Sequence, residues 1–159
     1  MAFRKSKIRP ELAELETRKS HLYDQNRSKA VSKRHASGGR TIRENIKDLC
    51  DEGSFLETGS LIVAAQRGRR SKEELIEQTP ADGLVAGLAR INGDIFAAER
   101  SQILVLGYDY TVLAGTQGAF NHKKTDRVLR QAGKLEAPIV FFVEGGGGRP
   151  GDVDFENIS

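Results

Sequence analysis

The chain has 159 residues and carries 25 Lys and Arg against 22 Asp and Glu, a formal net charge of +3. Hydrophobic residues make up 38% of the chain and charged residues 30%, which excludes disorder throughout and a collagen-like composition. The longest apolar run, residues 139–143, is far shorter than the roughly 18 residues that cross a bilayer, and the single cysteine permits no internal disulfide. We therefore expect one cytoplasmic domain without a transmembrane helix or a metal site.

The first 40 residues form a basic arm. They contain eleven Lys and Arg and four acids, a net charge of +7, whereas residues 41–159 contain fourteen and eighteen, a net charge of −4. From Pro10 onward the arm has the signals of a long helix, with acids near its start and bases later. Its apolar stripe is thin, so the helix should pack on something outside itself or bend. Such an arm could meet nucleic acid, an acidic partner or cofactor phosphates, although a solvated helix face is the commoner meaning of a charge run.

The segment after the arm predicts a short second helix. Thr41 suits its N-cap, Glu44 stands at the capping-box position and Gly53 marks its end. A short strand is expected within residues 55–65, and residues 66–82 predict a polar loop with one helical turn.

Regular pattern resumes with a predicted hairpin. Residues 84–91 and 94–98 flank Asn92-Gly93, a dipeptide that accepts the positive φ angles of a tight turn. The two segments should therefore pair as antiparallel strands.

The last regular elements predict a strand, a helix and a strand, over residues 103–112, 119–136 and 139–143. A crossover of this kind is right-handed and joins parallel strands. The two strands should therefore be parallel and buried on both faces. The fold class that follows is α/β, with glycine-rich exits from both strands.

The most informative segment is residues 144–152, which follows the last predicted strand with four consecutive glycines. Ligands bind at the carboxyl ends of parallel strands, and a turn without side chains lets backbone N–H groups approach a negatively charged oxygen. An oxyanion hole or a phosphate nest is one interpretation, and a flexible surface loop is the other. The location at a strand end, followed by Arg149, makes the two about equally favoured. The nucleotide-binding fingerprints are absent.

The exit from the preceding strand, AGTQG at residues 114–118, is the second glycine-containing loop. His122 lacks a carboxylate or cysteine at ligand spacing, so we interpret it, with His21 and His35, as structural or exposed. Lys123, Lys124 and Arg127 could face phosphates but predict a solvated helix face more often.

Three stretches of the sequence are similar to a known family. The run YDYTVLAGTQGAFNHKKTDRVLRQAGKLEAPIVFFVEGGGGRPGD resembles the amino-terminal half of the carboxyltransferase of biotin-dependent acyl-CoA carboxylases, the acetyl-CoA and propionyl-CoA carboxylase group. That family reads approximately DFTV-x-GGS-x-G-x-x-H-x-x-K, then a helix, APV and a strand ending in D-S-G-G-A-R-I. The upstream run KAVSKRHASGGRTIRENIKDLCDEGSFLETG is similar to the family's entry segment, and ADGLVAGLARING resembles its hairpin.

The resemblance implies a crotonase-like ββα superhelix, of which residues 41–159 would be the amino-terminal portion and residues 1–40 a preceding helical arm. It implies transfer of a carboxyl group from carboxybiotin, on a separate carrier, to the α-carbon of an acyl-CoA. By match, the candidate oxyanion donors are the backbone N–H groups of Gly146, Gly147 and Gly148. The candidate substrate-binding residues are Gly115, Thr116, Gln117, Gly118 and Arg149.

The implied cofactors are biotin on its carrier and coenzyme A within the substrate. The implied partners are acyl-CoA, a biotin carboxyl carrier protein with biotin carboxylase, and further copies in a homo- or hetero-oligomer, with neither nucleic acid nor membrane. Glu144 and Gly145 replace the family's Asp and Ser. The family's other donor pair and its biotin contacts belong to later segments, so this chain alone is expected to be inactive.

Two other functions are compatible with the sequence. The first is a catalytically inactive binding protein of the same fold that associates with a full-length relative. The second is a nucleic-acid-binding module led by the basic arm, which ranks last because no aromatic residues are interleaved with the arm's bases after Tyr23.

Overall fold

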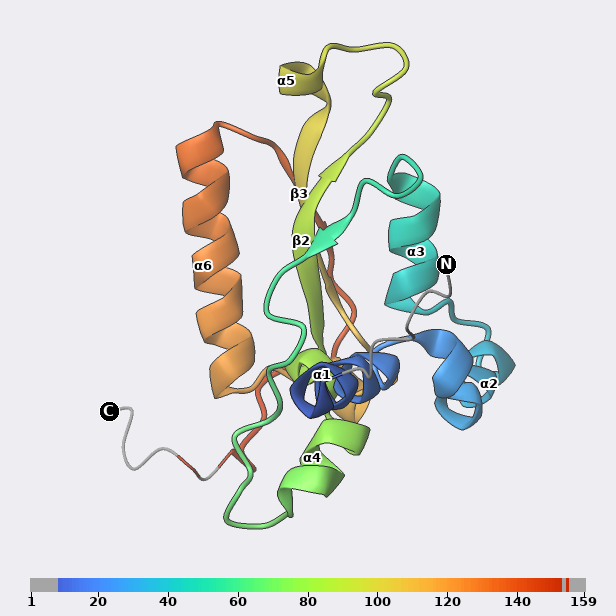
Figure 1. The fold of residues 1–159 in the computed structure, drawn as a ribbon, viewed down its shortest axis with the longest axis vertical. Coiled ribbons are helices and arrows are strands. Elements are labelled where there is room, and N and C mark those ends of the chain that lie inside the picture. Colours follow the sequence, from blue (N-terminus) through green and yellow to red (C-terminus); the bar gives the residue numbers. More distant parts are fainter. Residues whose placement is uncertain (1–8, 153, 155–159) are drawn as a thin grey trace, which may run out of the picture.

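One mixed sheet organises the chain (Figure 1). The computed structural model describes residues 9–152 and 154. The strands lie in the order β1-β2-β3-β4, with β1 antiparallel to β2, β2 antiparallel to β3, and β3 parallel to β4. Their bounds are Leu56–Glu57, Leu84–Arg90, Gln102–Tyr108 and Ile139–Phe142. The parallel pair predicted at the end of the chain is thus confirmed.

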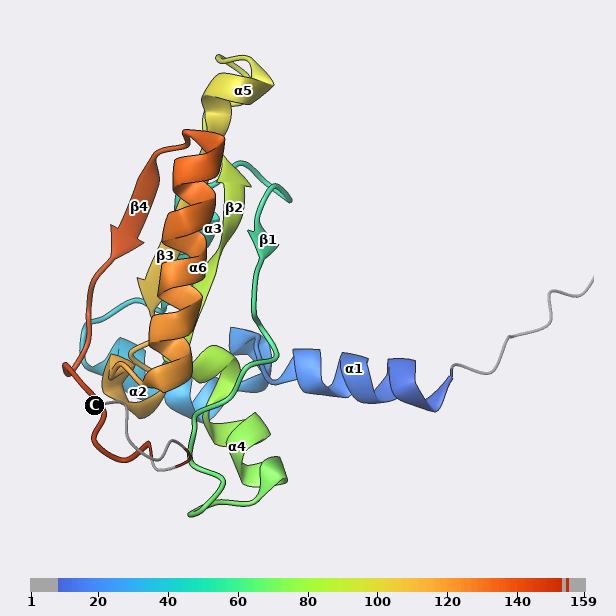
Figure 2. The ribbon, with the colours of Figure 1, turned by 90° about the vertical axis from the view of Figure 1, so that its left-hand side faces the viewer.

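Helices cover both faces of the sheet. The long helix α6 lies along one face and α3 along the other, while α1, α2 and α4 gather at the end of the sheet where β3 and β4 terminate (Figures 1 and 2). The α-helices are Pro10–Ser20 (α1), Ser28–Ala36 (α2), Ile42–Leu49 (α3), Lys72–Gln78 (α4), Ala98–Ser101 (α5) and Ala119–Leu135 (α6). Short 3₁₀ segments are Asp24–Asn26, Pro80–Gly83 and Leu113–Gly115. None of the helices described is long and apolar enough to span a membrane.

The core has two layers because side chains alternate between the faces of β2 and β3. The layer beneath α6 contains Leu84, Ala86, Leu104, Leu106, Tyr108, Val128 and Ala132. The layer beneath α3 contains Ile42, Ile46, Val85, Ala89, Ile103 and Val105. β3 is therefore the buried centre of the fold, and the loop that leaves it is anchored in the most rigid part of the chain.

The start of α3 confirms the predicted capping box. The Thr41 hydroxyl accepts a hydrogen bond from the Glu44 N–H at 3.1 Å, and the Glu44 carboxylate accepts one from the Thr41 N–H at 2.8 Å. The helix ends at Leu49, four residues before Gly53, because Cys50 is already extended. Residues 66–82 contain more helix than predicted, since Ser71 and Glu74 form a second capping box that begins α4.

The arm is bent, one of the two outcomes expected of so polar a helix. α1 and α2 are separated at residues 21–27, where Leu22 is buried and Tyr23 is extended. The Thr41 hydroxyl donates to the Asp24 carboxylate at 2.5 Å, which ties the bend to the start of α3. The bend thus allows Leu22 of the arm to be buried against the rest of the protein.

The predicted tight hairpin is wrong in its second strand. Asn92 has φ +53°, as expected, but the N–H groups of Ile95 and Phe96 both bond the Asn92 carbonyl, so the chain coils. The returning strand is β3, with Gln102 opposite Arg90. Ile95 and Phe96 are exposed, so residues 94–98 have no core for a strand to cover.

β4 is less covered than its apolar pattern alone predicts. The strand lies at the edge of the sheet, and Ile139 at its start and Val143 just after its end are 40% and 71% exposed. Phe141 packs on the α6 layer and Phe142 on the α3 layer, so both faces are covered only in part. The described residues supply no further strand beyond β4, which explains the exposed apolar surface.

Candidate functional site

Two loops meet at the carboxyl ends of β3 and β4, where α6 begins (Figure 2). The first follows β3 and contains residues 113–118, and the second follows β4 and contains residues 144–149; we call the second the glycine loop. The Gln117 N–H donates to the Gly147 carbonyl at 2.8 Å, and the Arg149 N–H donates to the Gln117 carbonyl at 2.8 Å. Gln117 and Gly148 thus form a parallel bridge that extends the β3·β4 pairing into the loops.

Glycine is required where the loops cross. A Cβ on Gly145 would clash with the Gly115 carbonyl oxygen, and a Cβ on Gly115 would lie 2.6 Å from the Glu144 carbonyl oxygen. Gly115 also has φ +63°, a conformation that L side chains rarely adopt. The crossing therefore fixes the position at which the remaining glycines leave the sheet.

The three predicted oxyanion donors differ in their hydrogen bonds. The Gly146 N–H donates to the Ala114 carbonyl at 3.0 Å, so it is already used within the protein. Within the part of the chain that the structure describes, the N–H groups of Gly147 and Gly148 have no acceptor, and both residues are exposed. Two adjacent N–H donors are thus available to an outside oxygen, whereas the predicted role of Gly146 would require its N–H to leave the Ala114 carbonyl.

Arg149 joins the two loops. Its side chain is 6% exposed, and its guanidinium donates to Asp82 at 2.5 Å, to the Thr116 carbonyl at 2.7 Å and to the Thr116 hydroxyl at 3.2 Å. These contacts link the glycine loop to the loop after β3. The predicted contact between Arg149 and substrate stays a prediction, to which these contacts add a positioning role.

Two carboxylates occupy the start of α6. Asp82 accepts from the Asn121 N–H at 2.8 Å and Asp152 accepts from the Ala119 N–H at 2.9 Å, so both satisfy helix N–H groups and complement the helix dipole. Burial raises the pKa of Asp82, and the Arg149 guanidinium acts against that rise. Gly118 is needed here, because a Cβ on it would clash with the Asp152 carboxylate. This helix start therefore offers no room to a substrate anion.

Lys124 is buried, which corrects the predicted solvated face. Its side chain lies on the inner face of α6 with Asn121, Val128 and Ala132, and only 3% of the residue is exposed. The ammonium donates to the Leu84 carbonyl, and burial lowers the Lys124 pKa from 10.5 to about 8. The helical spacing of residues 121, 124, 128 and 132 was the signal for this, masked by the basic neighbours.

The burial of Lys124 predicts an alkaline rise in stability. Between pH 8 and 10.5 the unfolded chain binds the Lys124 proton and the folded chain does not, so the free energy of unfolding increases with pH. The rise amounts to at most about 3 kcal/mol. Urea unfolding at both ends of this range should show it in the wild type and in Lys123→Met, an exposed control, but not in Lys124→Met. An equal rise in Lys124→Met would contradict the assignment.

The histidines are peripheral to these loops. His122 is exposed, and His35 Nε2 lies 2.9 Å from a Glu44 carboxylate oxygen. Among the described residues no three His, Cys, Asp or Glu side chains are grouped as metal ligands.

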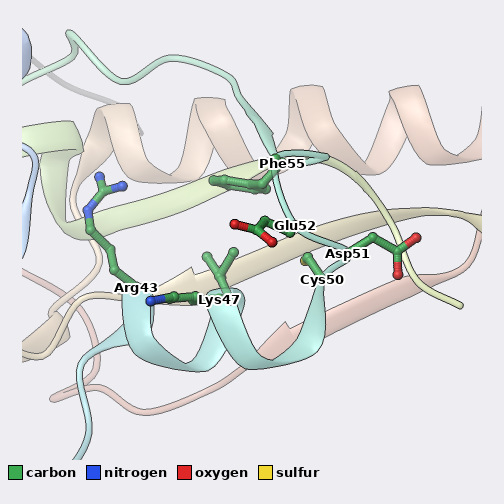
Figure 3. Close-up of a pocket in the computed structure, with 8 residues that line it drawn as sticks. Arg43, Lys47, Cys50, Asp51, Glu52 and Phe55 are labelled. Carbon is green, nitrogen blue, oxygen red and sulfur yellow. The ribbon is translucent and has the colours of Figure 1, made fainter. Parts of the chain in front are cut away.

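A separate cavity of about 540 Å³ lies between α3 and the segment that leads into β1 (Figure 3). Arg43, at one end of it, donates to both carboxylate oxygens of Glu57, at 3.0 and 3.1 Å. Burial raises the pKa of the Cys50 thiol, which makes it a weak nucleophile. The cavity is lined by Arg43, Ile46, Lys47, Cys50, Asp51, Glu52, Gly53 and Phe55, none of which belongs to the two loops.

The sequence matches the family model described as "Carboxyl transferase domain" over residues 33–156. It is 32% identical to the propionyl-CoA carboxylase beta chain of Saccharopolyspora erythraea over 139 residues, which is 87% of this chain and 23% of that protein. It is 30% identical to the methylmalonyl-CoA decarboxylase subunit alpha of Propionigenium modestum over 122 residues, 76% of this chain and 22% of that protein. The chain thus spans about a quarter of the length of these relatives.

Solved structures agree with the sequence matches. A single-chain, multi-domain long-chain acyl-CoA carboxylase superposes with a TM-score of 0.87 and 57% identity, over 92% of this chain and 15% of that one. The transcarboxylase 12S hexamer superposes with a TM-score of 0.71 and 26% identity, over 92% of this chain and 27% of that one. The fold is therefore that of part of an α/β carboxyltransferase, and the chain belongs to the carboxyl transferase domain family of biotin-dependent acyl-CoA carboxylases.

Proposed function

We propose that this chain supplies the acyl-CoA side of a carboxyltransferase, with the N–H groups of Gly147 and Gly148 as donors to the thioester oxygen. The observation that carries the proposal is the pair of adjacent N–H groups that have no acceptor among residues 9–152 and 154, in an exposed loop at the carboxyl end of two parallel strands. Donors of this kind stabilise charge that develops during the reaction.

The residues present fit an enolate oxygen. Removal of the α-proton of an acyl-CoA places negative charge on the thioester oxygen, and a rigid N–H pair stabilises that charge without rearrangement. The bridge at Gln117 and the guanidinium of Arg149 hold the loop, so the donors are positioned in advance. Biotin, carried by a separate protein, would deliver the carboxyl group, and we assign none of the described residues to it.

The substrate we favour is a long-chain acyl-CoA. The support is the 57% identity to the long-chain acyl-CoA carboxylase, against 32% to the propionyl-CoA carboxylase beta chain. A cavity of about 750 Å³ between α4 and the segment after β1 could accept a hydrocarbon chain, since its walls include Leu61, Ile62, Val63, Leu75 and Ile76. Titration of the ¹⁵N-labelled chain with dodecanoyl-CoA and with propionyl-CoA, followed by amide spectra, compares the two affinities and tests this substrate preference. Tighter binding of propionyl-CoA would count against it.

The intact enzyme would have the crotonase-like architecture, further copies of the subunit, and a biotin carrier with its carboxylase as partners. Transcarboxylase 12S supports the expected further copies and the acyl-CoA substrate, because it is a hexamer whose structures contain bound methylmalonyl-CoA. A catalytically inactive binding protein of the same fold is the alternative, and it predicts that the loops cannot support turnover in any context.

The purified chain alone should show no carboxyl transfer from malonyl-CoA or methylmalonyl-CoA to biotin. These 159 residues provide one donor pair and span about a quarter of the length of the relatives, and the resemblance places the family's biotin contacts outside that quarter. The test is a turnover assay of the chain beside a graft of residues 33–152 into the corresponding segment of the long-chain acyl-CoA carboxylase. An active graft with an inactive isolated chain supports the proposal. A folded, assembled graft without turnover favours the inactive binding protein, and turnover by the isolated chain shows that the later segments are not needed.

A further inference from the structure

We infer that Arg34, in α2 of the basic arm, is a positioning residue that sets the glycine loop through Glu144. The inference rests on the proposed function of that loop. It also gives the arm a role that its charge alone did not indicate.

Glu144 and Arg149, at the two ends of the glycine loop, are the side chains by which it can be held, because residues 145–148 are all glycine. The Glu144 carboxylate accepts from the Arg34 guanidinium at 2.5 Å. Glu144 is also the residue whose backbone carbonyl lies against Gly115 at the loop crossing. A change in the position of the Glu144 side chain should therefore move the backbone where the glycine loop leaves β4.

The Arg34 side chain is itself fixed from several directions. It is 10% exposed, its Nε donates to the Arg40 carbonyl at 2.9 Å, and its guanidinium carbon lies 4.8 Å from the centre of the Tyr110 ring. Gly39 leaves the space it needs, because a Cβ there would clash with the guanidinium. Because the Arg34 side chain has so little freedom, it can hold Glu144 in one position, whereas a mobile surface lysine would not.

The Arg34 guanidinium therefore contacts the segment between β3 and the first loop, through Tyr110, and the glycine loop, through Glu144. The neighbouring Arg27, which precedes α2, strengthens the attachment: it donates to the Asp109 carboxylate at 3.0 Å, and the two side chains are 9% and 6% exposed. Glu144 is 54% exposed, so its ion pair adds little stability by itself. Its effect should be on geometry.

The first test measures positioning without catalysis. In the isotope-labelled 159-residue chain, Arg34→Met should shift the amide signals of Gly147 and Gly148 and speed the hydrogen exchange of Gly146, whose N–H bonds the Ala114 carbonyl. Arg40→Met is the matched control, because it removes the same charge from the same arm but breaks exposed contacts, with the Asp48 carboxylate and the Glu44 carbonyl, that do not reach the glycine loop. Arg40→Met should leave the glycine signals in place. Unchanged glycine amides in a folded Arg34→Met chain would overturn the inference.

The second test uses the active graft and a double-mutant cycle. Arg34→Met and Glu144→Gln should each lower kcat about tenfold to a hundredfold, the scale of a misplaced catalytic group, with KM and Tm little changed. Because both act through one contact, the double variant should fall no further. Arg34→Lys should recover part of the loss. Multiplied losses in the double variant, or a fall in Tm with kcat unchanged, would show a merely structural role. Shifted glycine amides with an inactive wild-type graft would instead reject the proposed function and leave the positioning intact.

Discussion

Replacing Gly148 with valine should lower the kcat of acyl-CoA carboxylation by about 10² or more in the graft described above, the usual effect of losing one oxyanion donor. Gly148 is exposed, no atom lies within 4 Å of where its Cβ would stand, and its φ is not positive. The Cβ of a valine therefore has free space, and we expect its methyl groups to fill the space through which a thioester oxygen would approach the N–H groups. Steady-state kinetics and a melting curve measure the two effects separately.

Gly148 is a cleaner test than Gly147. Gly147 has φ +82°, so any side chain there strains the backbone and could lower activity through the fold. Gly133→Ala, in an exposed turn of α6 with free space around its Cβ, is the matched control and should leave kcat unchanged. Full activity of Gly148→Val would remove the glycine loop from the reaction.

The second large effect is on stability. Arg149→Met should lower the free energy of unfolding by about 3–5 kcal/mol, since it leaves the Asp82 carboxylate buried without its partner. The Asp82 side chain is 0% exposed and the Arg149 side chain 6% exposed, so solvent cannot replace the lost contact. Adding Asp82→Asn to the variant should restore part of the loss. Urea unfolding of the single and double variants measures both.

This loss should shrink as the pH falls. The Arg149 guanidinium lowers the pKa of Asp82 against the effect of burial, so its removal raises that pKa further. The folded variant then binds a proton at a pH at which the unfolded chain does not, and its stability increases toward acid. A loss that is equal at pH 5 and pH 8 would show that Asp82 does not carry the effect.

Local signals made much of the architecture predictable. The capping box at Thr41 depends on two neighbouring side chains, and the parallel pairing of β3 with β4 follows from the handedness of a crossover. The predicted second strand of the hairpin is wrong because Asn92-Gly93 fixes a turn but not the residue at which the next strand begins. The core residues of β3 determine where that strand begins.

The sequence indicated where a candidate site would lie, but it did not predict the contacts within that site. Four glycines after a buried strand indicate backbone donors, but a sequence does not show that Ala114 takes the Gly146 N–H. The Arg149 guanidinium bonds Asp82, which is 67 residues away in the sequence, so local pattern does not predict that contact. Lys124 is buried because α6 turns the face that carries it toward the sheet. The division of the chain at residue 40 stays a prediction.

The central claim is that Gly147 and Gly148 donate to a thioester oxygen. Amide spectra of the ¹⁵N-labelled chain, titrated with dodecanoyl-CoA, test it most directly. We predict downfield shifts of the Gly147 and Gly148 amide protons, with little change at Gly146, which already bonds Ala114, and none at Gly133. Binding of dodecanoyl-CoA that shifts other amides but leaves Gly147 and Gly148 unmoved would contradict the account.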